Sequence, residues 1–169
     1  MIVGLDPGQE GALALLDMGG KPVAVRDMPT VKRRIGDTLR PRVDLPALRD
    51  LLAEWEPSQV VVEFVEPRKG DGPRAGWLMK SSGQAEGVVV GMRLPLIFAP
   101  PRDWRRDSGV TGKRYEDRKE ASRVAARELF PDWCHMLTAK AHADRAEAML
   151  IARWGLRARV LGFAPRVPA

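Results

Sequence analysis

Cysteine and histidine are scarce in this sequence of 169 residues, which contains one cysteine, Cys134, and two histidines. A single cysteine excludes an intrachain disulfide framework and a cysteine-based zinc site, and it favours a reducing compartment. No apolar run approaches the roughly 20 residues that a membrane-spanning helix requires. Asp6 falls where a signal peptide would need its apolar core. The sequence therefore predicts a cytoplasmic protein that has no membrane partner.

Acidic residues are outnumbered by basic ones, 22 against 28, which gives a formal net charge of +6 and a pI near 10.0. Of the basic residues, 7 are lysine and 21 are arginine. Arginine suits bidentate contact with phosphate, so a polyanionic partner is expected. Genome base composition or heat adaptation would produce the same bias. The length is sufficient for a single domain with a sizeable core.

The first strand expected in the sequence, residues 1–6, ends in a carboxylate, Asp6. Pro7 and Gly8 follow, and a second apolar run covers residues 11–16, a pattern that predicts a strand-turn-strand hairpin. A charge at the end of a buried strand is costly unless a partner neutralises it, and a metal ion is one such partner. The alternative is that Asp6 only begins a turn.

The order of the remaining elements predicts the fold class. We expect a third strand at 22–28, a polar loop at 30–42, and a helix that follows the N-cap Asp44 and ends near Trp55. A strand at 59–64 should lie parallel to the first. The other expected segments are a mobile loop at 66–76, a helix at 77–92, a strand at 94–99, a basic loop, helices at 115–129 and 142–154, and a loosely held tail. This order matches a single α/β domain over 1–169 with a ribonuclease H-like, five-stranded mixed sheet and helices on both faces.

Four carboxylates occupy positions at which this topology would bring them together: Asp6, Glu63, Asp144 and Glu147. Asp144 and Glu147 are three residues apart on a helix and so share one side of it. Adjacent parallel strands would deliver Asp6 and Glu63 to one sheet edge. Hard oxygen ligands of this kind suit Mg²⁺ or Mn²⁺. Two such ions about 4 Å apart can promote phosphodiester cleavage.

Each acid also has a simpler interpretation. Glu63 can be a strand acid that faces solvent, and Glu66 competes for its role, although the strand period places Glu66 on the opposite face. Asp144 can be a helix-dipole acid, and Glu147 a surface partner of Arg145 or Arg153. His142, near the same helix, can be a metal ligand, a general acid or simply an exposed imidazole.

Basic residues that could line a DNA channel are Lys32, Arg33, Arg34, Arg68, Lys69, Arg74, Lys80, Arg105, Arg106, Lys113 and Arg114. Phosphate contacts of this kind give salt-dependent affinity. Residues 102–127 also contain acids, so a solvated helix face is an equal alternative there. Trp77 is expected in the core or at an interface, or else as a wedge against bases. The small residues Gly83 and Gly87 would permit close helix-helix approach in a two-fold dimer.

Several of these segments together resemble the RuvC-like Holliday junction resolvases, especially their small bacteriophage relatives. The segments that carry the resemblance are GLDPG at 4–8, VVVEF at 60–64, SSGQAEGVVVG at 81–91, PPRDWRRDSGVTG at 100–112, LFP at 129–131 and DRAEAMLIARWG at 144–155. One position departs from the family pattern, because bacterial members usually have Asp where this chain has Glu147. The partner acid at that end, Asp144 or the nearby His142, stays open.

The resemblance implies a homodimeric, structure-selective endodeoxyribonuclease that acts on four-way DNA junctions. Such enzymes nick two strands symmetrically with two Mg²⁺ or Mn²⁺ ions per active site. By position, Asp6, Glu63, Asp144 and Glu147 would be the catalytic, metal-binding acids. A bacterial or phage-infected cell would be the setting. The alternatives are a non-catalytic branched-DNA-binding module of the same fold and an actin-like kinase relative, for which the chain is too short.

Overall fold

The structure, a computed structural model, describes residues 1–67 and 72–160, without the side chains of 73, 74, 159 and 160. Its central sheet has the strand order β3-β2-β1-β6-β7. The strands are β1 (Ile2–Asp6), β2 (Ala12–Leu16), β3 (Pro22–Asp27), β6 (Gln59–Glu63) and β7 (Leu96–Ala99). Strand β2 pairs antiparallel with both β1 and β3, whereas β6 pairs in parallel with both β1 and β7. The predicted mixed five-stranded sheet is therefore confirmed.

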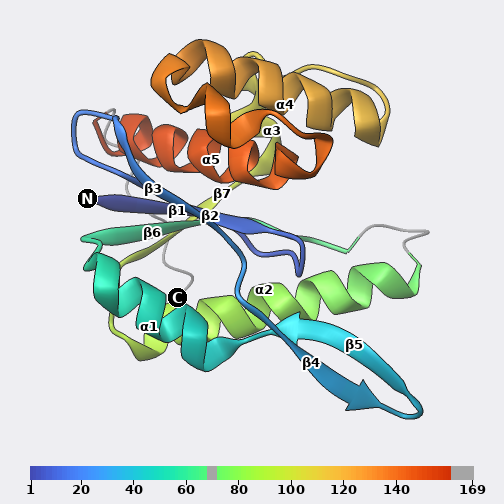
Figure 1. The fold of residues 1–169 in the computed structure, drawn as a ribbon. Coiled ribbons are helices and arrows are strands. Elements are labelled where there is room, and N and C mark those ends of the chain that lie inside the picture. Colours follow the sequence, from blue (N-terminus) through green and yellow to red (C-terminus); the bar gives the residue numbers. More distant parts are fainter. Residues whose placement is uncertain (68–71, 161–169) are drawn as a thin grey trace.

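Helices cover both faces of the sheet (Figure 1). One face carries α1 (Leu45–Trp55) and α2 (Pro73–Gly91), and the other carries α3 (Pro101–Asp107), α4 (Tyr115–Leu129) and α5 (Ala143–Val160). Short 3₁₀ turns, η1 (Pro131–Leu137) and η2 (Lys140–His142), connect α4 to α5. Because β1 is buried on both sides, its alternate residues contribute to two separate cores, Ile2 to the core beneath α5 and Val3 to the core beneath α1 and α2. The buried strand therefore has no polar face.

Helix α1 shows how local sequence determines an element. The Asp44 carboxylate accepts a hydrogen bond from the Ala47 backbone N–H at 3.2 Å, as an N-cap should. Leu48, Leu52 and Trp55 are buried and fall at helical spacing. Glu56 then adopts a left-handed conformation with φ 44°, which ends the helix before Pro57. The prediction for this helix is confirmed.

The interpretation of residues 30–42 as a loop is wrong. They form most of a β-hairpin, β4 (Thr30–Ile35) and β5 (Thr38–Val43), which projects beside α2 in Figure 1. The turn between the strands contains Gly36 with φ 57°, followed by Asp37. A Gly-Asp pair is a hairpin turn signal, because glycine tolerates the positive φ that such turns require. The polar, basic composition of residues 30–42 instead favoured the interpretation as a loop.

Three further boundaries differ from the prediction. Helix α2 begins at Pro73, inside the expected loop, because proline is well tolerated in a first helical turn. Residues 101–107 form the unpredicted helix α3, which begins with Pro101 in the same way. Helix α5 continues past Trp154 to Val160. Residues 68–71 of the expected mobile loop and 161–169 of the expected loose tail lie outside the described residues.

Candidate metal centre

The closeness of β1 and α5 positions the acids. A Cβ atom added at Gly4 would lie 2.1 Å from the Ala148 carbonyl oxygen and 2.4 Å from the Ala152 backbone nitrogen. Only glycine therefore permits this approach. Asp6 is two residues further along the strand and so faces the same side as Gly4. Glu147 precedes Ala148 on α5, which brings the two carboxylates to one place.

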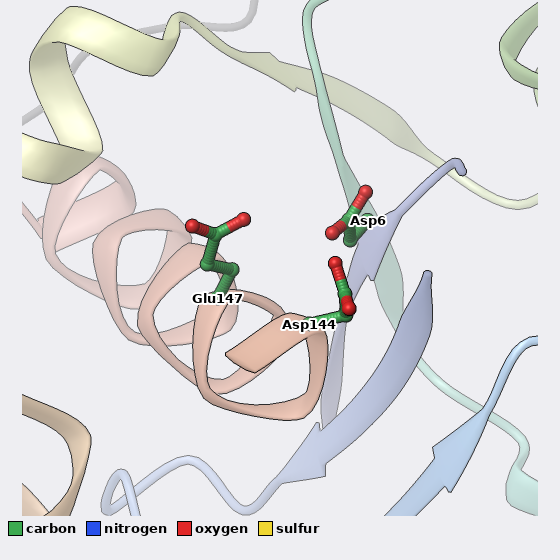
Figure 2. A group of neighbouring side chains, drawn as sticks. All are labelled: Asp6, Asp144 and Glu147. Carbon is green, nitrogen blue, oxygen red and sulfur yellow. The ribbon is translucent and has the colours of Figure 1, made fainter. Parts of the chain in front are cut away.

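Asp6, Asp144 and Glu147 form a three-carboxylate cluster (Figure 2). One oxygen from each side chain lies within 4.8 Å of the others. Asp6 and Glu147 are buried, with 6% and 3% exposure, and Asp144 is partly exposed. Carboxylate oxygens are the ligands that Mg²⁺ and Mn²⁺ prefer. The donor set therefore fits a divalent ion.

Glu63 lies beside this cluster but is not one of its three members. It ends β6, and its Oε1 atom accepts hydrogen bonds from Trp104 Nε1 at 3.1 Å and from Arg105 Nη2 at 3.2 Å. Both donors converge on the same oxygen. Because Trp104 is fully buried, its indole fixes the position of this carboxylate. Among the described residues, no hydrogen bond is made to the other carboxylate oxygen, Oε2.

Lys119 occupies the centre of the acidic cluster. Its Nζ lies 2.6 Å from Asp144 Oδ1, 2.6 Å from Glu147 Oε2 and 3.8 Å from Asp6 Oδ2. The Ser122 hydroxyl, on the same face of α4, lies 3.1 Å from Glu147 Oε1. Sequence reasoning placed Lys119 within a basic segment and did not consider Ser122. Their spacing of three on a predicted helix was the available signal.

The electrostatics of the cluster follow from burial. Burial raises the pKa of Asp6 well above its usual range, and the neighbouring acids raise it further, while Lys119 opposes the shift. Burial and the repulsion of Glu147 raise the pKa of Glu63, against the lowering effect of Arg105 and Trp104. Burial alone would lower the pKa of Lys119, but Asp6, Glu147 and Asp144 outweigh it and raise that pKa. The site thus requires positive charge, and Lys119 supplies one.

The competing interpretations of the site residues can be compared with the geometry. His142 Nδ1 accepts a hydrogen bond from the Ala139 backbone N–H at 3.2 Å, outside the three-acid cluster. Arg145 pairs with Asp27, and Arg153 pairs with Asp107 at 2.7 Å, so Glu147 is the surface partner of neither. Glu66 is exposed, whereas Glu63 lines the same cleft as the cluster.

The cleft above the acids has a volume of about 670 Å³. Its acidic lining consists of Asp6, Glu10, Glu63, Asp144 and Glu147, and its basic lining of Arg40, Arg42, Arg105, Arg118 and Lys119. Trp77 lines one side and is partly buried beneath the Arg42 guanidinium. The cleft therefore places aromatic and cationic side chains around the candidate metal site.

The predicted DNA-contacting residues divide into three groups. Lys32, Arg33, Arg34, Lys80, Arg106 and Lys113 are exposed. Arg114 is also exposed but pairs with Asp117 at 3.2 Å, as Arg106 does with Asp103 at 3.3 Å, whereas Arg105 is partly buried and pairs with Glu63. Arg68 and Lys69 lie outside the described residues, as does the side chain of Arg74. Among the described helices, none is long and apolar enough to cross a membrane.

Comparisons with known proteins identify the fold. No protein-family model matches the chain. Thermus thermophilus RuvC in complex with a Holliday junction substrate superimposes with a TM-score of 0.64 at 16% identity, over 97% of each chain. The chain has the ribonuclease H-like fold. A second Thermus thermophilus RuvC structure matches this fold with a TM-score of 0.55 at 17% identity, over 97% of this chain and 98% of that one.

One curated relative also shares sequence with the chain. The Holliday junction resolvase MOC1, chloroplastic, of Chlamydomonas reinhardtii is 38% identical over 90 residues, or 53% of this chain. Those residues amount to 10% of that protein, so the chain spans only a small part of its length.

Proposed function

We propose that this protein is a divalent-metal-dependent endodeoxyribonuclease that resolves four-way DNA junctions by paired, symmetric nicks. The observation that carries the proposal is the cluster of Asp6, Asp144 and Glu147, with Glu63 on the same cleft. A ribonuclease H-like fold surrounds it. The relative and the structural match named above are a Holliday junction resolvase and a RuvC with a junction substrate. Both support DNA junctions as the substrate class.

The roles of the four acids follow from their contacts. Asp6, Asp144 and Glu147 would hold the metal ions together with Glu63, which lines the same cleft. Bound Mg²⁺ or Mn²⁺ would polarise the scissile phosphodiester and lower the pKa of an attacking water. Lys119 holds compensating charge among the same acids. Trp104 and Arg105 keep one Glu63 oxygen engaged, which orients the other.

The binding surface in this proposal combines the exposed hairpin residues Lys32, Arg33 and Arg34 with Lys80, Arg106 and Lys113. A homodimer would place two such sites around one junction. We further propose that residues 1–169 act as a single nuclease domain in the cytoplasm of a bacterial or phage-infected cell. The curated relative is, by its name, a chloroplast protein.

The decisive experiment is cleavage of a synthetic four-way junction with Mg²⁺ or Mn²⁺. Wild type should produce symmetric nicks, whereas Asp6→Asn and Glu63→Gln should lose cleavage by at least about a hundredfold while retaining junction binding. Asp50→Asn is the matched control, because Asp50 is an exposed acid on α1. A wild-type protein that binds junctions but cuts no branched DNA with either metal would refute the nuclease.

One observation favours a second function, a non-catalytic branched-DNA-binding module. The Lys119 ammonium already neutralises part of the cluster through its two contacts of 2.6 Å. A site stabilised in this way does not depend on a metal. This alternative predicts salt-sensitive junction binding that Asp6→Asn leaves unchanged, with no cleavage by wild type.

A further inference from the structure

Arg42 is a buried arginine on the wall of the candidate metal cleft. It lies near the end of β5, is only 9% exposed, and stacks on the Trp77 ring of α2 with its guanidinium carbon 3.7 Å from the ring centroid. Both side chains line the cleft that contains Asp6 and Glu63. The hairpin and α2 thus meet through a cationic side chain beside the candidate site.

The hydrogen bonds of Arg42 are incomplete. Its Nη1 donates to the Pro41 carbonyl oxygen at 2.6 Å. With the Gln9 amide oriented to satisfy its neighbours, the Gln9 oxygen accepts from the same Nη1 at 3.0 Å. The Nη2 atom is buried and has no hydrogen-bond partner among the described residues. No described carboxylate lies within ion-pair distance of this guanidinium, although five acids line the same cleft.

A buried guanidinium without an anion is unfavourable, because desolvation of a charge is offset only by pairing and hydrogen bonding. Stacking on tryptophan offsets part of this cost. The hairpin could have been anchored on Trp77 by an apolar side chain without the penalty. An anionic ligand in the cleft would give the Nη2 atom a partner and offset the remaining cost.

We propose that Arg42, held on Trp77, forms an anion subsite that binds a phosphodiester oxygen of the DNA strand entering the cleft. This inference rests on the proposed function. The planar guanidinium presents N–H donors suited to phosphate oxygens, and stacking preorganises it. Arg42 would hold a phosphate on the wall formed by the hairpin and α2, and the acids would hold cations at the sheet edge.

The test uses Arg42→Met in the full-length chain, because methionine retains apolar contact with Trp77 and removes the charge. In metal-free buffer with EDTA, its junction affinity should fall roughly tenfold, since a charge-assisted hydrogen bond is lost. The slope of log K against log salt concentration should become shallower by about 1. The melting temperature should be equal to or above that of wild type.

Two further variants sharpen the comparison. Arg49→Met removes an exposed arginine on α1 that pairs with Asp50, and it should leave affinity and salt slope unchanged. Arg42→Lys should restore the salt slope but only part of the affinity, because lysine lacks the planar fork. Inorganic phosphate, tested alone, distinguishes a free-anion site from a DNA site. The DNA assignment would be overturned if phosphate raised the melting temperature of wild type but not of Arg42→Met, while the two proteins bound junctions with equal affinity.

The proposal is overturned if Arg42→Met melts at a lower temperature than wild type and binds junctions with an unchanged salt slope, because Arg42 would then be a structural anchor. Failure to fold at all would have the same meaning, since the proposal requires a fold that is stable without this charge. These outcomes concern DNA binding without metal. Failure of the nuclease would instead appear as absence of cleavage by wild type with Mg²⁺ or Mn²⁺.

Discussion

Burial of each carboxylate in the acidic cluster is unfavourable by itself, and the contacts with Lys119 offset part of this cost. Asp6 and Glu147 are almost fully buried, and Lys119 contacts both of them and Asp144. Removing one partner from such a set leaves the others uncompensated, whereas neutralising surplus charge relieves repulsion. Because the cluster has three acids for one lysine, it carries surplus negative charge that a bound cation would balance.

Asp6→Asn should stabilise the metal-free protein. Burial holds the folded-state pKa of Asp6 well above the usual value for an aspartate. The folded state therefore favours protonated Asp6. This contribution to the free energy of unfolding is fully present below the pKa of Asp6 in the unfolded chain, and it is lost as pH rises through its pKa in the folded protein. At neutral pH the variant should gain on the order of 1 kcal/mol and melt a few degrees higher.

Thermal unfolding in EDTA across the acid-to-neutral range measures this effect. The melting temperature of wild type should fall more than that of Asp6→Asn as pH rises. Asp50→Asn provides the control for loss of an exposed acid. A lower melting temperature for Asp6→Asn at neutral pH would show that its attraction to Lys119 outweighs the cost of burial.

Trp104→Phe should weaken metal binding through Glu63. The substitution keeps most of the buried ring but deletes the indole N–H that donates to Glu63 Oε1 at 3.1 Å. Loss of one hydrogen bond to a carboxylate should cost roughly 1–3 kcal/mol. We expect Mn²⁺ affinity, measured by electron paramagnetic resonance without DNA, to fall roughly tenfold.

A double-mutant cycle separates positioning from packing. In a Glu63→Gln background, Trp104→Phe should cause little further loss of Mn²⁺ affinity. Trp55→Phe, in the core on the other side of the sheet, is the packing control. If Trp104→Phe lowered stability equally in the wild-type and Glu63→Gln backgrounds and left Mn²⁺ binding unchanged, Trp104 would contribute to packing alone.

Among the elements, the β4–β5 hairpin is the one that differs most from expectation. A two-stranded ribbon is marginally stable alone and needs packing against another element. Val43 at its base is buried, and Arg42 stacks on α2. The outer residues Lys32, Arg33 and Arg34 remain exposed. Packing at its base therefore fixes the orientation of the basic β4–β5 hairpin beside the cleft.

Replacing Lys32, Arg33 and Arg34 together by glutamine should weaken junction binding without unfolding the protein. If each side chain neutralises one phosphate, the slope of log K against log salt should become shallower by about 3. Stability should change by less than about 0.5 kcal/mol per residue, because the side chains are exposed. Salt titrations followed by fluorescence anisotropy measure the slope.

Three exposed cations elsewhere in the chain, Lys21, Arg49 and Lys140, provide the matched triple control. Their replacement by glutamine removes the same charge from the molecule. If both triple variants lose the same slope, general charge determines binding and the hairpin has no special role.

At the scale of the whole molecule, one face of α2 is left open. Cβ atoms added at Gly83 and Gly87 would meet nothing within 4 Å, and Val90 on the same helix is 60% exposed. Small residues permit close helix approach, and the proposed paired nicks require two sites. The expected homodimer is therefore proposed to form through this face.

Gly87→Glu should convert such a dimer to monomers without destabilising the monomer fold. The open surroundings accommodate the side chain, and replacing glycine within a helix should be favourable by up to about 1 kcal/mol. Sedimentation equilibrium measures the mass of the assembly. Ala53→Glu, at an exposed position on α1, is the control. A dimer that survives Gly87→Glu would place the interface elsewhere.

The sequence by itself determined the elements whose signals are local. Strands β1, β2 and β6 follow from continuous apolar runs, and α1 follows from its Asp44 cap and helical periodicity. The parallel pairing of β6 with β1 followed from the intervening helix. Asp6 and Glu63, at the ends of these parallel strands, could therefore be assigned to one edge of the sheet from the sequence alone.

Only the tertiary structure decided which side chains surround those acids. Lys119 lies 25 residues from Asp144 and 28 from Glu147, and Trp104 lies 41 residues from Glu63. These contacts depend on how α3 and α4 pack against α5 and β6, which no local pattern encodes. The same holds for Arg42, because its place in the cleft depends on the docking of a hairpin onto α2. Local periodicity and capping specify elements, whereas burial and charge compensation at a site emerge from packing between distant segments.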